Sequence, residues 1–430
     1  RKAPTAVSYL ACARRLLQDS PHLYPQFATH NAQTVAAVME MAGDREYEFQ
    51  RLHGMGEGLY GQLVERSGQG RRHCRIYAPV GSHETLLPYL VRRMLENGAN
   101  SSFVHRLHEE HLEQLITDPV TTLKGYGTWR HPRIPLPGAL YAPSRRNSRG
   151  LDFADRQTLR KLAADMNRIG ARAPWNGGPL CGGRLRTGHG HGVYAPSDRG
   201  REVGRVTWAG DEDLETALAA AHQAWTAWDE RPPAQRAAIL DRVADLLEQH
   251  TAELMVLCVE EAGKTLRDAQ AEVREAVDFC RYYAAQVRER FIRPLSLPGV
   301  TGERNELSLR GRGVFLCISP WNFPLAIFTG QVTAALAAGN GVIAKPAEQA
   351  SLVAVRATQL MHQAGVPVNV LHCLPGRGEE IGPRLVADPR IAGVAFTGST
   401  ETARLIHRGL AAREHGPIVP LIAETGGINA

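Results

Sequence analysis

The stretch GVFLCISPWNFP (residues 313–324) starts as an apolar run and ends in a turn that contains two prolines and an asparagine. A short apolar run bounded by glycine and proline is typical of a strand that is buried on both faces. Helical and strand-like patterns then alternate: QVTAALAAG (331–339), GVIAKP (341–346), LVAVRATQLMHQAG (352–365), NVLHCLP (369–375) and IAGVAFTGS (391–399). This alternation predicts a parallel, doubly wound α/β sheet of the nucleotide-binding type.

Helical patterns precede this sheet. Asp211 can cap a long amphipathic helix that includes DLETALAAAHQAWTAW (213–228), because an aspartate accepts hydrogen bonds from the free N–H groups of a first helical turn. Two further helical patterns cover residues 234–250 and 253–290. We therefore expect the nucleotide-binding part to extend over residues 204–430.

The first part of the chain, residues 1–120, has strand-then-helix units of its own. A strand-like run precedes a helical one three times: YPQFATHN (24–31) before AQTVAAVMEMA (32–42), YEFQRLHGMG (47–56) before GLYGQLVE (58–65), and CRIYAPVG (74–81) before ETLLPYLVRRMLEN (84–97). This spacing predicts parallel α/β structure. Three units are too few to close an eight-stranded barrel alone.

Between these parts the composition changes. Gly and Pro supply 20 of the 84 residues from 120 to 203. Such a composition indicates loops rather than packed elements, so we expect residues 121–203 to be a linker that contains one short helix near 155–167.

The net charge of +6 comes from this middle region. The stretch from Thr121 to Gly210 contains 16 Lys and Arg residues but only 5 Asp and Glu residues. The cations are scattered among Gly and Pro without a helical stripe or interleaved aromatics, which favours a solvated basic segment over a nucleic-acid interface. The seven cysteines are dispersed and form no CxxC pair, as is typical of a reducing cytoplasm.

Four motifs in the second half carry chemistry. The turn after the first strand offers the side-chain amide of Asn322, and KPAEQ (345–349) places a cation and a carboxylate three residues apart after a strand. FTGST (396–400) is a strand, a glycine turn and a helix start, an arrangement that can bind pyrophosphate through free N–H groups. ETGG (424–427) places a carboxylate beside a turn.

Together these motifs resemble the aldehyde dehydrogenase superfamily. The resemblance implies NAD-dependent oxidation of an aldehyde through a cysteine thiohemiacetal and a thioester. It also implies the site residues: Asn322 for the oxyanion, Lys345 and Glu348 for the adenosine ribose, Gly398 and Ser399 for the pyrophosphate, Ile318, Pro320 and Trp321 for the cofactor and aldehyde channel, and Glu424 for activation of the hydrolytic water.

The nucleophilic cysteine of that family is expected near position 458, beyond the 430 residues of this sequence. Cys317 and Cys373 lie inside predicted strands, where a cysteine usually acts as a small core hydrophobe, so neither is expected to replace it. From these residues alone we expect part of an NAD site without the covalent step.

The first part of the chain has a second set of polar groups. FATHN (27–31), QRLHGMGE (50–57) and IYAPVG (76–81) place them at the carboxyl ends of predicted strands, the end that carries the site in an α/β barrel. The next helix presents Arg92 and Arg93, which spacing alone assigns to a solvated face with an Arg92–Glu96 pair. A guanidinium clamp for a substrate carboxylate is the alternative. The apolar positions of this helix are expected to pack: Leu86, Leu87, Leu90, Val91, Met94 and Leu95.

These motifs, in this order and followed by TGERNELSLRGRG (301–313), resemble the bifunctional proline utilization A family. The resemblance implies the C-terminal part of a proline dehydrogenase (β/α)8 barrel, a linker, and the N-terminal, NAD-binding (Rossmann-like) part of an aldehyde dehydrogenase fold. It also implies FAD contacts and a proline site. The FAD contacts would be Thr29, His30, Asn31 and Gln50, with Glu96 beside the flavin, and the proline contacts would be Leu52, Tyr77, Arg92 and Arg93.

The family implies oxidation of L-proline with FAD, then oxidation of glutamate semialdehyde to L-glutamate with NAD. It further implies a homo-oligomer in the cytoplasm that reaches the inner membrane in its reduced state and passes electrons to a membrane quinone. Two alternatives stay open: a catalytically inactive module that only binds NAD or a partner, and a single-function aldehyde dehydrogenase with an N-terminal extension.

No metal site is expected. HRLHEEH places His105, His108 and His111 three residues apart, and this spacing drifts around a helix instead of converging on one ion. His189 and His191 lie in a glycine-rich stretch without further ligands nearby in the sequence.

Overall fold

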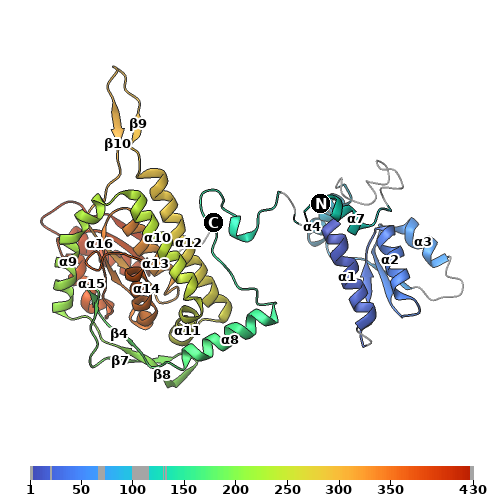
Figure 1. The fold of residues 1–430 in the computed structure, drawn as a ribbon, viewed down its shortest axis with the longest axis horizontal. Coiled ribbons are helices and arrows are strands. Elements are labelled where there is room, and N and C mark those ends of the chain that lie inside the picture. Colours follow the sequence, from blue (N-terminus) through green and yellow to red (C-terminus); the bar gives the residue numbers. More distant parts are fainter. Residues whose placement is uncertain are drawn as a thin grey trace. The chain divides into compact units, whose positions relative to one another are not determined.

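The computed structural model describes residues 3–19, 22–65, 73–98, 116–128, 130 and 133–426. These residues form two compact units, Arg1–Pro135 and Leu136–Ala430 (Figure 1). Within the described ranges, no helix combines the length and the apolar character that crossing a bilayer requires.

The first unit has a small parallel sheet with strand order β1-β2-β3. Its elements follow the expected alternation: α1 (Ala3–Asp19), β1 (Gln26–Ala28), α2 (Ala32–Ala42), β2 (Glu48–Leu52), α3 (Glu57–Glu65), β3 (His73–Tyr77), α4 (His83–Gly98) and α7 (Pro119–Gly125). A core of Phe27, Val38, Phe49 and Tyr60 joins the sheet to its helices. The predicted strand-then-helix units are therefore confirmed.

The apolar positions of α4 differ from the expectation. Leu87, Leu90, Val91, Met94 and Leu95 are exposed instead of packed, with exposed fractions from 44% to 72%. The reason is that burial of this apolar stripe needs a partner element, and none of the described elements of the three-stranded unit covers it.

The second unit is built on a seven-stranded sheet with strand order β15-β14-β11-β12-β13-β5-β6. Its strands are β5 (Leu180–Cys181), β6 (Arg184–Leu185), β11 (Val314–Ile318), β12 (Gly341–Lys345), β13 (Leu371–Cys373), β14 (Ile391–Gly398) and β15 (Leu421–Thr425). The strands from β15 to β13 are parallel, whereas β5 is antiparallel to β13. Because β11 leads to β12 on one side and later pairs with β14 on the other, the topological switch point lies between β11 and β14.

Helices cover both faces of this sheet, as Figure 1 shows. The helices of the second unit are α8 (Arg156–Gly170), which lies against α11, α9 (Asp211–Glu230), α10 (Pro233–Gln249), α11 (Thr251–Ala262), α12 (Leu266–Arg290), α13 (Ala326–Ala337), α14 (Ser351–Gln363), α15 (Gly378–Ala387) and α16 (Thr400–Ala411), with short 3-10 turns η1 (Pro137–Ala139) and η2 (Glu348–Ala350). Alternate residues of β11 point to opposite faces. Phe315 and Cys317 pack in the core under α10 to α14, whereas Val314 and Leu316 pack under α9, α15 and α16.

Two helix boundaries differ from the sequence-based expectation. The pattern over 253–290 is two helices, because Gly263 adopts φ +67°, a left-handed conformation that ends α11. The cap of α9 is Gly210 and not Asp211. The Asp213 side chain accepts the Gly210 backbone N–H at 2.8 Å, while Asp211 forms an ion pair with Arg384.

Residues 136–203 of the expected linker are structured and belong to the second unit, while residues 121–125 lie in α7 of the first unit. Besides β5, β6 and α8, residues 136–203 contribute to a three-stranded sheet with strand order β4-β8-β7, formed by Trp175–Gly177, Asp198–Val206 and His191–Ala195. Glycines and prolines are as frequent in short strands joined by tight turns as in linkers, so composition could not separate the two. The helix expected near 155–167 is confirmed as α8, which Asp155 caps.

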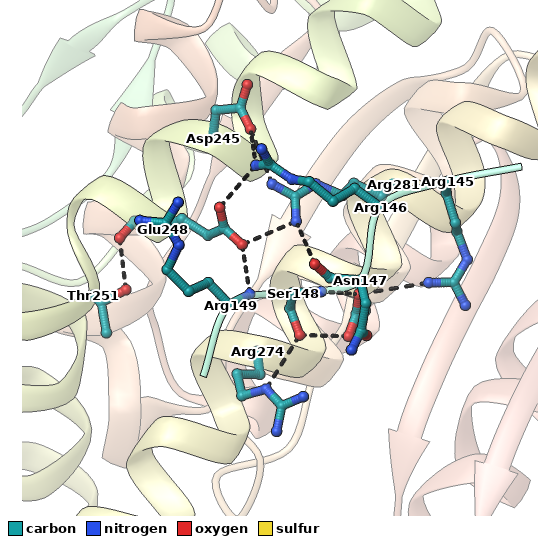
Figure 2. Close-up of polar contacts among 11 residues, drawn as sticks. Arg145, Arg146, Asn147, Ser148, Arg149, Asp245, Glu248, Thr251, Arg274 and Arg281 are labelled. Atoms are coloured by element: carbon teal, nitrogen blue, oxygen red, sulfur yellow. Dashed lines mark hydrogen bonds and ion pairs between the residues drawn. The ribbon is translucent and has the colours of Figure 1, made fainter. Parts of the chain in front are cut away.

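A polar cluster holds residues 145–149 against α10 and α12, as Figure 2 shows. The Arg281 guanidinium donates to Glu248 at 2.9 Å and to Asp245 at 3.0 Å, and Arg146 donates to the same two carboxylates. Ser148 donates its hydroxyl to Asp278 at 2.6 Å. These bonds fix the beginning of the second unit to its helical layer.

The hairpin of β9 (Leu295–Leu297) and β10 (Asn305–Leu307) projects from the body of the second unit (Figure 1). Leu295 is 61% exposed and Leu307 is 49% exposed.

Candidate active site

The switch point of the second unit brings the chemical motifs to one edge of the sheet. Ile318 ends β11, Lys345 ends β12 and Gly398 ends β14. Since these strands are parallel neighbours, their carboxyl ends open on the same crevice, where ligands bind in doubly wound folds.

The Asn322 turn connects β11 to α13 at this crevice. Ile318 and Pro320 are half-buried, whereas Trp321 and Asn322 are exposed. The turn therefore presents an amide N–H donor outside the sheet edge, as expected for a group that would meet an oxygen of a bound substrate.

Lys345 and Glu348 form an ion pair, with Nζ 3.2 Å from Oε2. Burial lowers the pKa of Lys345, and the Glu348 carboxylate only partly offsets this effect. Burial alone would raise the pKa of Glu348, but the Lys345 charge and the hydrogen bonds from Lys345 and from backbone N–H groups together outweigh burial and lower that pKa. Lys345 is 3% exposed while Glu348 is half-buried, so the pair offers a donor and an acceptor at its accessible side, a combination that suits vicinal hydroxyl groups.

The helix α16 starts directly after β14. The Ser399 hydroxyl accepts the Thr402 N–H at 3.1 Å and caps the helix. Gly398 is backed by the Phe396 ring, because a Cβ added to Gly398 would lie 2.7 Å from a ring carbon. An amino terminus of this kind at the switch point suits a phosphate group, so the residues present fit the NAD that the motifs imply.

Gln331 was not singled out from the sequence. Its side-chain amide donates to the Ile318 carbonyl at 3.2 Å and to the Thr397 hydroxyl at 2.9 Å. This one side chain of α13 therefore ties together the ends of β11 and β14 across the switch point. No local pattern marks it, because both partners are distant in sequence.

Glu424 lies in β15, opposite Thr397 of β14, and is exposed. It lines a cavity of about 570 Å³ together with Gln331, Thr397 and apolar groups of α12 and α13, among them Phe279. The carboxylate thus faces a space that can hold water or a small molecule.

The two strand cysteines are core residues, as predicted. Cys317 is 1% exposed and Cys373 is 0% exposed. Burial raises the pKa of each thiol to about 12. Since the thiolate is the reactive form, neither side chain is a nucleophile at neutral pH.

Glu261, at the end of α11, is 3% exposed and was also missed. Its two oxygens accept the N–H groups of Leu352 at 2.7 Å and Val353 at 2.9 Å. Burial raises the pKa of Glu261 to about 7, although these backbone hydrogen bonds act in the opposite direction. A raised folded-state pKa contributes stability that is present below the unfolded pKa and is lost as the pH rises through 7.

We therefore expect a pH-dependent difference between the wild type and Glu261→Gln. Between pH 5 and pH 8, the free energy of unfolding of the wild type should fall by about 2–3 kcal/mol more than that of the variant, because only the wild type deprotonates this side chain. Urea unfolding at both pH values measures the difference. Parallel pH profiles would contradict the assignment.

The first unit places its predicted groups at one sheet edge. Asn31 caps α2 by accepting the Gln33 N–H at 2.9 Å, and the Thr29 carbonyl accepts the Tyr60 hydroxyl at 2.6 Å. The His30 ring lies 3.5 Å from the Leu52 backbone nitrogen, which connects the ends of β1 and β2. The ends of these strands are therefore fixed in a polar edge that fits a flavin.

Gln50 is engaged within the sheet. Its amide donates to Glu48 at 3.2 Å, and Glu48 also pairs with Arg75 at 2.6 Å. Hydrogen bonds from Arg75 lower the pKa of Glu48 to about 2, so this carboxylate is charged at neutral pH. The buried Glu48 is a further site-adjacent residue that sequence patterns did not indicate.

The residues expected to bind proline are more exposed than those expected to bind the flavin. Leu52 and Tyr77 are paired at the ends of β2 and β3, and Tyr77 is 57% exposed. Arg92 is exposed, whereas Arg93 is half-buried and lies 5.3 Å from the Tyr89 ring centroid. The Glu96 side chain, and with it the expected Arg92–Glu96 pair, lies outside the described residues.

For metals, the described ranges contain no group of three or more His, Cys, Asp and Glu side chains that could hold an ion. His105, His108 and His111 lie outside these ranges. The His191 ring stacks on Trp208 with centroids 3.5 Å apart, and Arg377 lies 5.1 Å from the Trp208 ring.

Comparisons with known proteins agree with the two units. Residues 1–106 match the proline dehydrogenase family and residues 186–430 match the aldehyde dehydrogenase family. The first match argues against a single-function aldehyde dehydrogenase with an unrelated extension.

The whole chain is 49% identical to the bifunctional protein PutA of Klebsiella aerogenes, of which it covers 33%. A solved variant of proline utilization A from Bradyrhizobium japonicum is 50% identical, with a TM-score of 0.77 over 100% of this chain and 40% of that one. A 1-pyrroline-5-carboxylate dehydrogenase from Thermus, solved with bound NAD, is 33% identical, with a TM-score of 0.63 over 69% of this chain and 56% of that one.

The chain thus spans about a third of the length of the curated relatives that it matches from end to end. Both of its units, in the same order, have counterparts in those relatives. Through its second unit the chain belongs to the aldehyde dehydrogenase family, and over its whole length it is similar to the proline utilization A proteins.

Proposed function

We propose that this chain is part of a bifunctional oxidoreductase of proline catabolism. It oxidises L-proline to 1-pyrroline-5-carboxylate with FAD, and it oxidises glutamate semialdehyde, the hydrolysed form of that product, to L-glutamate with NAD. The observation that carries the proposal is the gathering of the Asn322 turn, the Lys345–Glu348 pair and the Ser399-capped helix at one switch-point crevice.

In the second unit, the proposed NAD contacts bind different parts of the cofactor. Lys345 and Glu348 hold the ribose hydroxyls, while Gly398 and Ser399 let the pyrophosphate approach the amino terminus of α16. When bound, NAD supplies the electron acceptor for the aldehyde.

The aldehyde side of the crevice is lined by Ile318, Pro320 and Trp321. Asn322 donates its amide N–H to the substrate oxygen as negative charge develops there. Glu424 accepts a proton from the water that releases the product, since its carboxylate lines the adjoining cavity.

In the first unit, the polar strand ends hold the flavin. Thr29, His30, Asn31, Gln50 and Glu96 are its proposed contacts, and FAD supplies the electron acceptor for proline.

The proline site lies beside that edge. Arg92 and Arg93 bind the proline carboxylate, because a guanidinium binds a carboxylate through paired N–H donors. Tyr77 and Leu52 pack on the proline ring. Transfer of the electrons to a membrane quinone and assembly into a homo-oligomer are further parts of the proposal.

The test uses the intact protein from its source cells. We expect this protein to catalyse proline-dependent dye reduction and NAD-dependent oxidation of glutamate semialdehyde. We also expect an intact mass of about three times 47.1 kDa, since the chain covers 33% of its relatives. A mass near 47.1 kDa together with neither activity would favour the inactive NAD-binding module instead.

A further inference from the structure

Two glutamates flank the turn between α11 and α12, and both are almost fully buried. Glu261 is 3% exposed and Glu272 is 1% exposed. Each carboxylate accepts backbone N–H groups from the amino terminus of a different helix that follows a strand of the central sheet.

Glu272 holds the start of α13. Its Oε2 accepts the Leu325 N–H at 3.2 Å and the Ala326 N–H at 2.9 Å, while its Oε1 lies 3.0 Å from Lys264 Nζ. The Lys264 ammonium also lies 4.3 Å from the Phe323 ring centroid. Phe323 and Leu325 closely follow Asn322 in the turn. The Glu272–Lys264 pair therefore contacts this turn twice, through the Phe323 ring and through the Leu325 N–H group.

Glu261 holds the start of α14 in the same way, through the Leu352 and Val353 N–H groups. The η2 turn, Glu348–Ala350, comes immediately before α14. The position of the Glu348 carboxylate, and with it the Lys345–Glu348 pair, therefore depends on the Glu261 contacts.

These caps differ from others in the chain. The helices α2, α8 and α16 are capped locally by Asn31, Asp155 and Ser399, whereas the N-cap residues of α13 and α14 make no side-chain hydrogen bond to their helices. A local cap needs no distant buried carboxylate, and burying a carboxylate is costly. Unlike local caps, these distant caps fix the positions of α13 and α14 relative to the same element, the turn between α11 and α12.

We propose that Glu261 and Glu272 are positioning residues for the two halves of the NAD crevice, with Glu272 and Lys264 placing the Asn322 turn and Glu261 placing the Lys345–Glu348 pair. The inference rests on the proposed function. It assigns separable effects to the two side chains, because each acts on a different strand end.

The test compares Glu261→Gln and Glu272→Gln in the intact protein. A glutamine at 272 can keep one oxygen on the backbone N–H groups but places its NH2 group against the Lys264 ammonium. A glutamine at 261 loses one of two backbone bonds, because both oxygens of Glu261 accept. Two readouts separate the effects: kcat for semialdehyde at saturating NAD, and the NAD dissociation constant, measured by competition against fluorescent NADH.

For Glu272→Gln we expect kcat to fall about tenfold or more while the NAD dissociation constant stays within about threefold, because misplaced donors act on the reacting oxygen. For Glu261→Gln we expect the reverse, a dissociation constant raised about five- to tenfold with kcat within about threefold. The matched control is Glu253→Gln on α11, whose carboxylate pairs with His250 and with Arg356, a residue of α14 beyond the N–H groups that Glu261 binds. It should lower the Tm and leave both readouts unchanged.

Lower Tm values with unchanged kcat and NAD affinity in both glutamine variants would show a purely structural role and overturn the inference. If a glutamine variant does not fold, Lys264→Met tests the placement of the Asn322 turn and Glu261→Asp tests the placement of the Lys345–Glu348 pair. The first should lower kcat and the second should raise the NAD dissociation constant, as for the glutamine variants. A wild type without NAD-dependent semialdehyde oxidation would overturn the proposed function and this inference with it. Wild-type activity that all variants retain would overturn the inference alone.

Discussion

Replacing Asn322 by alanine is expected to lower kcat for semialdehyde oxidation by about 100- to 1000-fold, since loss of one donor to a developing oxyanion has effects of this size. The amide sits on an exposed turn at the end of β11, so its removal leaves the core unchanged. The NAD dissociation constant should stay close to that of the wild type. Steady-state kinetics with glutamate semialdehyde and NAD measure the effect.

Proline oxidation by the same preparation is the internal reference, because Asn322 belongs to the second unit. Its rate should not change. Asn322→Asp is the matched variant of equal size: it removes the donor and adds a negative charge, so it should be at least as slow as the alanine variant. A kcat above one-tenth of the wild-type value in both variants would exclude Asn322 as the oxyanion donor.

The second large effect is expected for Arg281→Ala, which should lower the free energy of unfolding by about 3 kcal/mol. The Arg281 side chain is 4% exposed and bonds to Glu248, Asp245 and the Asn147 carbonyl (Figure 2). Without it, the buried side of Glu248 loses its cation. The loss stays at the lower end of the range for broken buried pairs because Glu248 keeps its contacts to residues 146 and 149.

Arg288→Ala on the same helix is the control. Arg288 pairs with Asp241 at 2.6 Å, but both side chains are well exposed, at 44% and 39%. Exposed pairs contribute little, so a loss below about 1 kcal/mol is expected. Urea unfolding followed by near-UV circular dichroism measures both variants. Equal losses would mean that burial does not decide the contribution of these arginines.

The strands β11 to β14 could be predicted from sequence because they are apolar runs separated by glycine and proline, as expected for parallel strands that helices cover on both faces. The strands β15, β5 and β6 were not predicted, and β15 is largely exposed. The same logic located Lys345, Ser399 and Asn322, which directly follow or end those runs.

The residues that hold these groups in place could not be predicted. Glu272 and Leu325 are 53 positions apart, and Glu261 and Leu352 are 91 positions apart, so no local pattern connects them. In helical patterns both glutamates look like ordinary solvated positions. Only the packing of α11 and α12 against the sheet buries them.

The exposed face of α4 shows the opposite difficulty. Its apolar stripe correctly predicted a helix with one face to bury, but a periodic pattern does not identify the partner element. The burial of Leu87, Leu90 and Met94 was therefore inferred from the pattern alone, and the described residues leave these side chains exposed.

The antiparallel strand β5 has a consequence for handling the second unit alone. It pairs with β13 at Leu180 and Cys373, and β6 continues the sheet beyond it. A polypeptide started at residue 204, where the composition becomes ordinary, would lack both strands and leave the hydrogen-bonding groups of β13 open. Open strand edges recruit other chains, so such a polypeptide should aggregate more than one that starts at Leu136, in which β5 and β6 keep β13 covered.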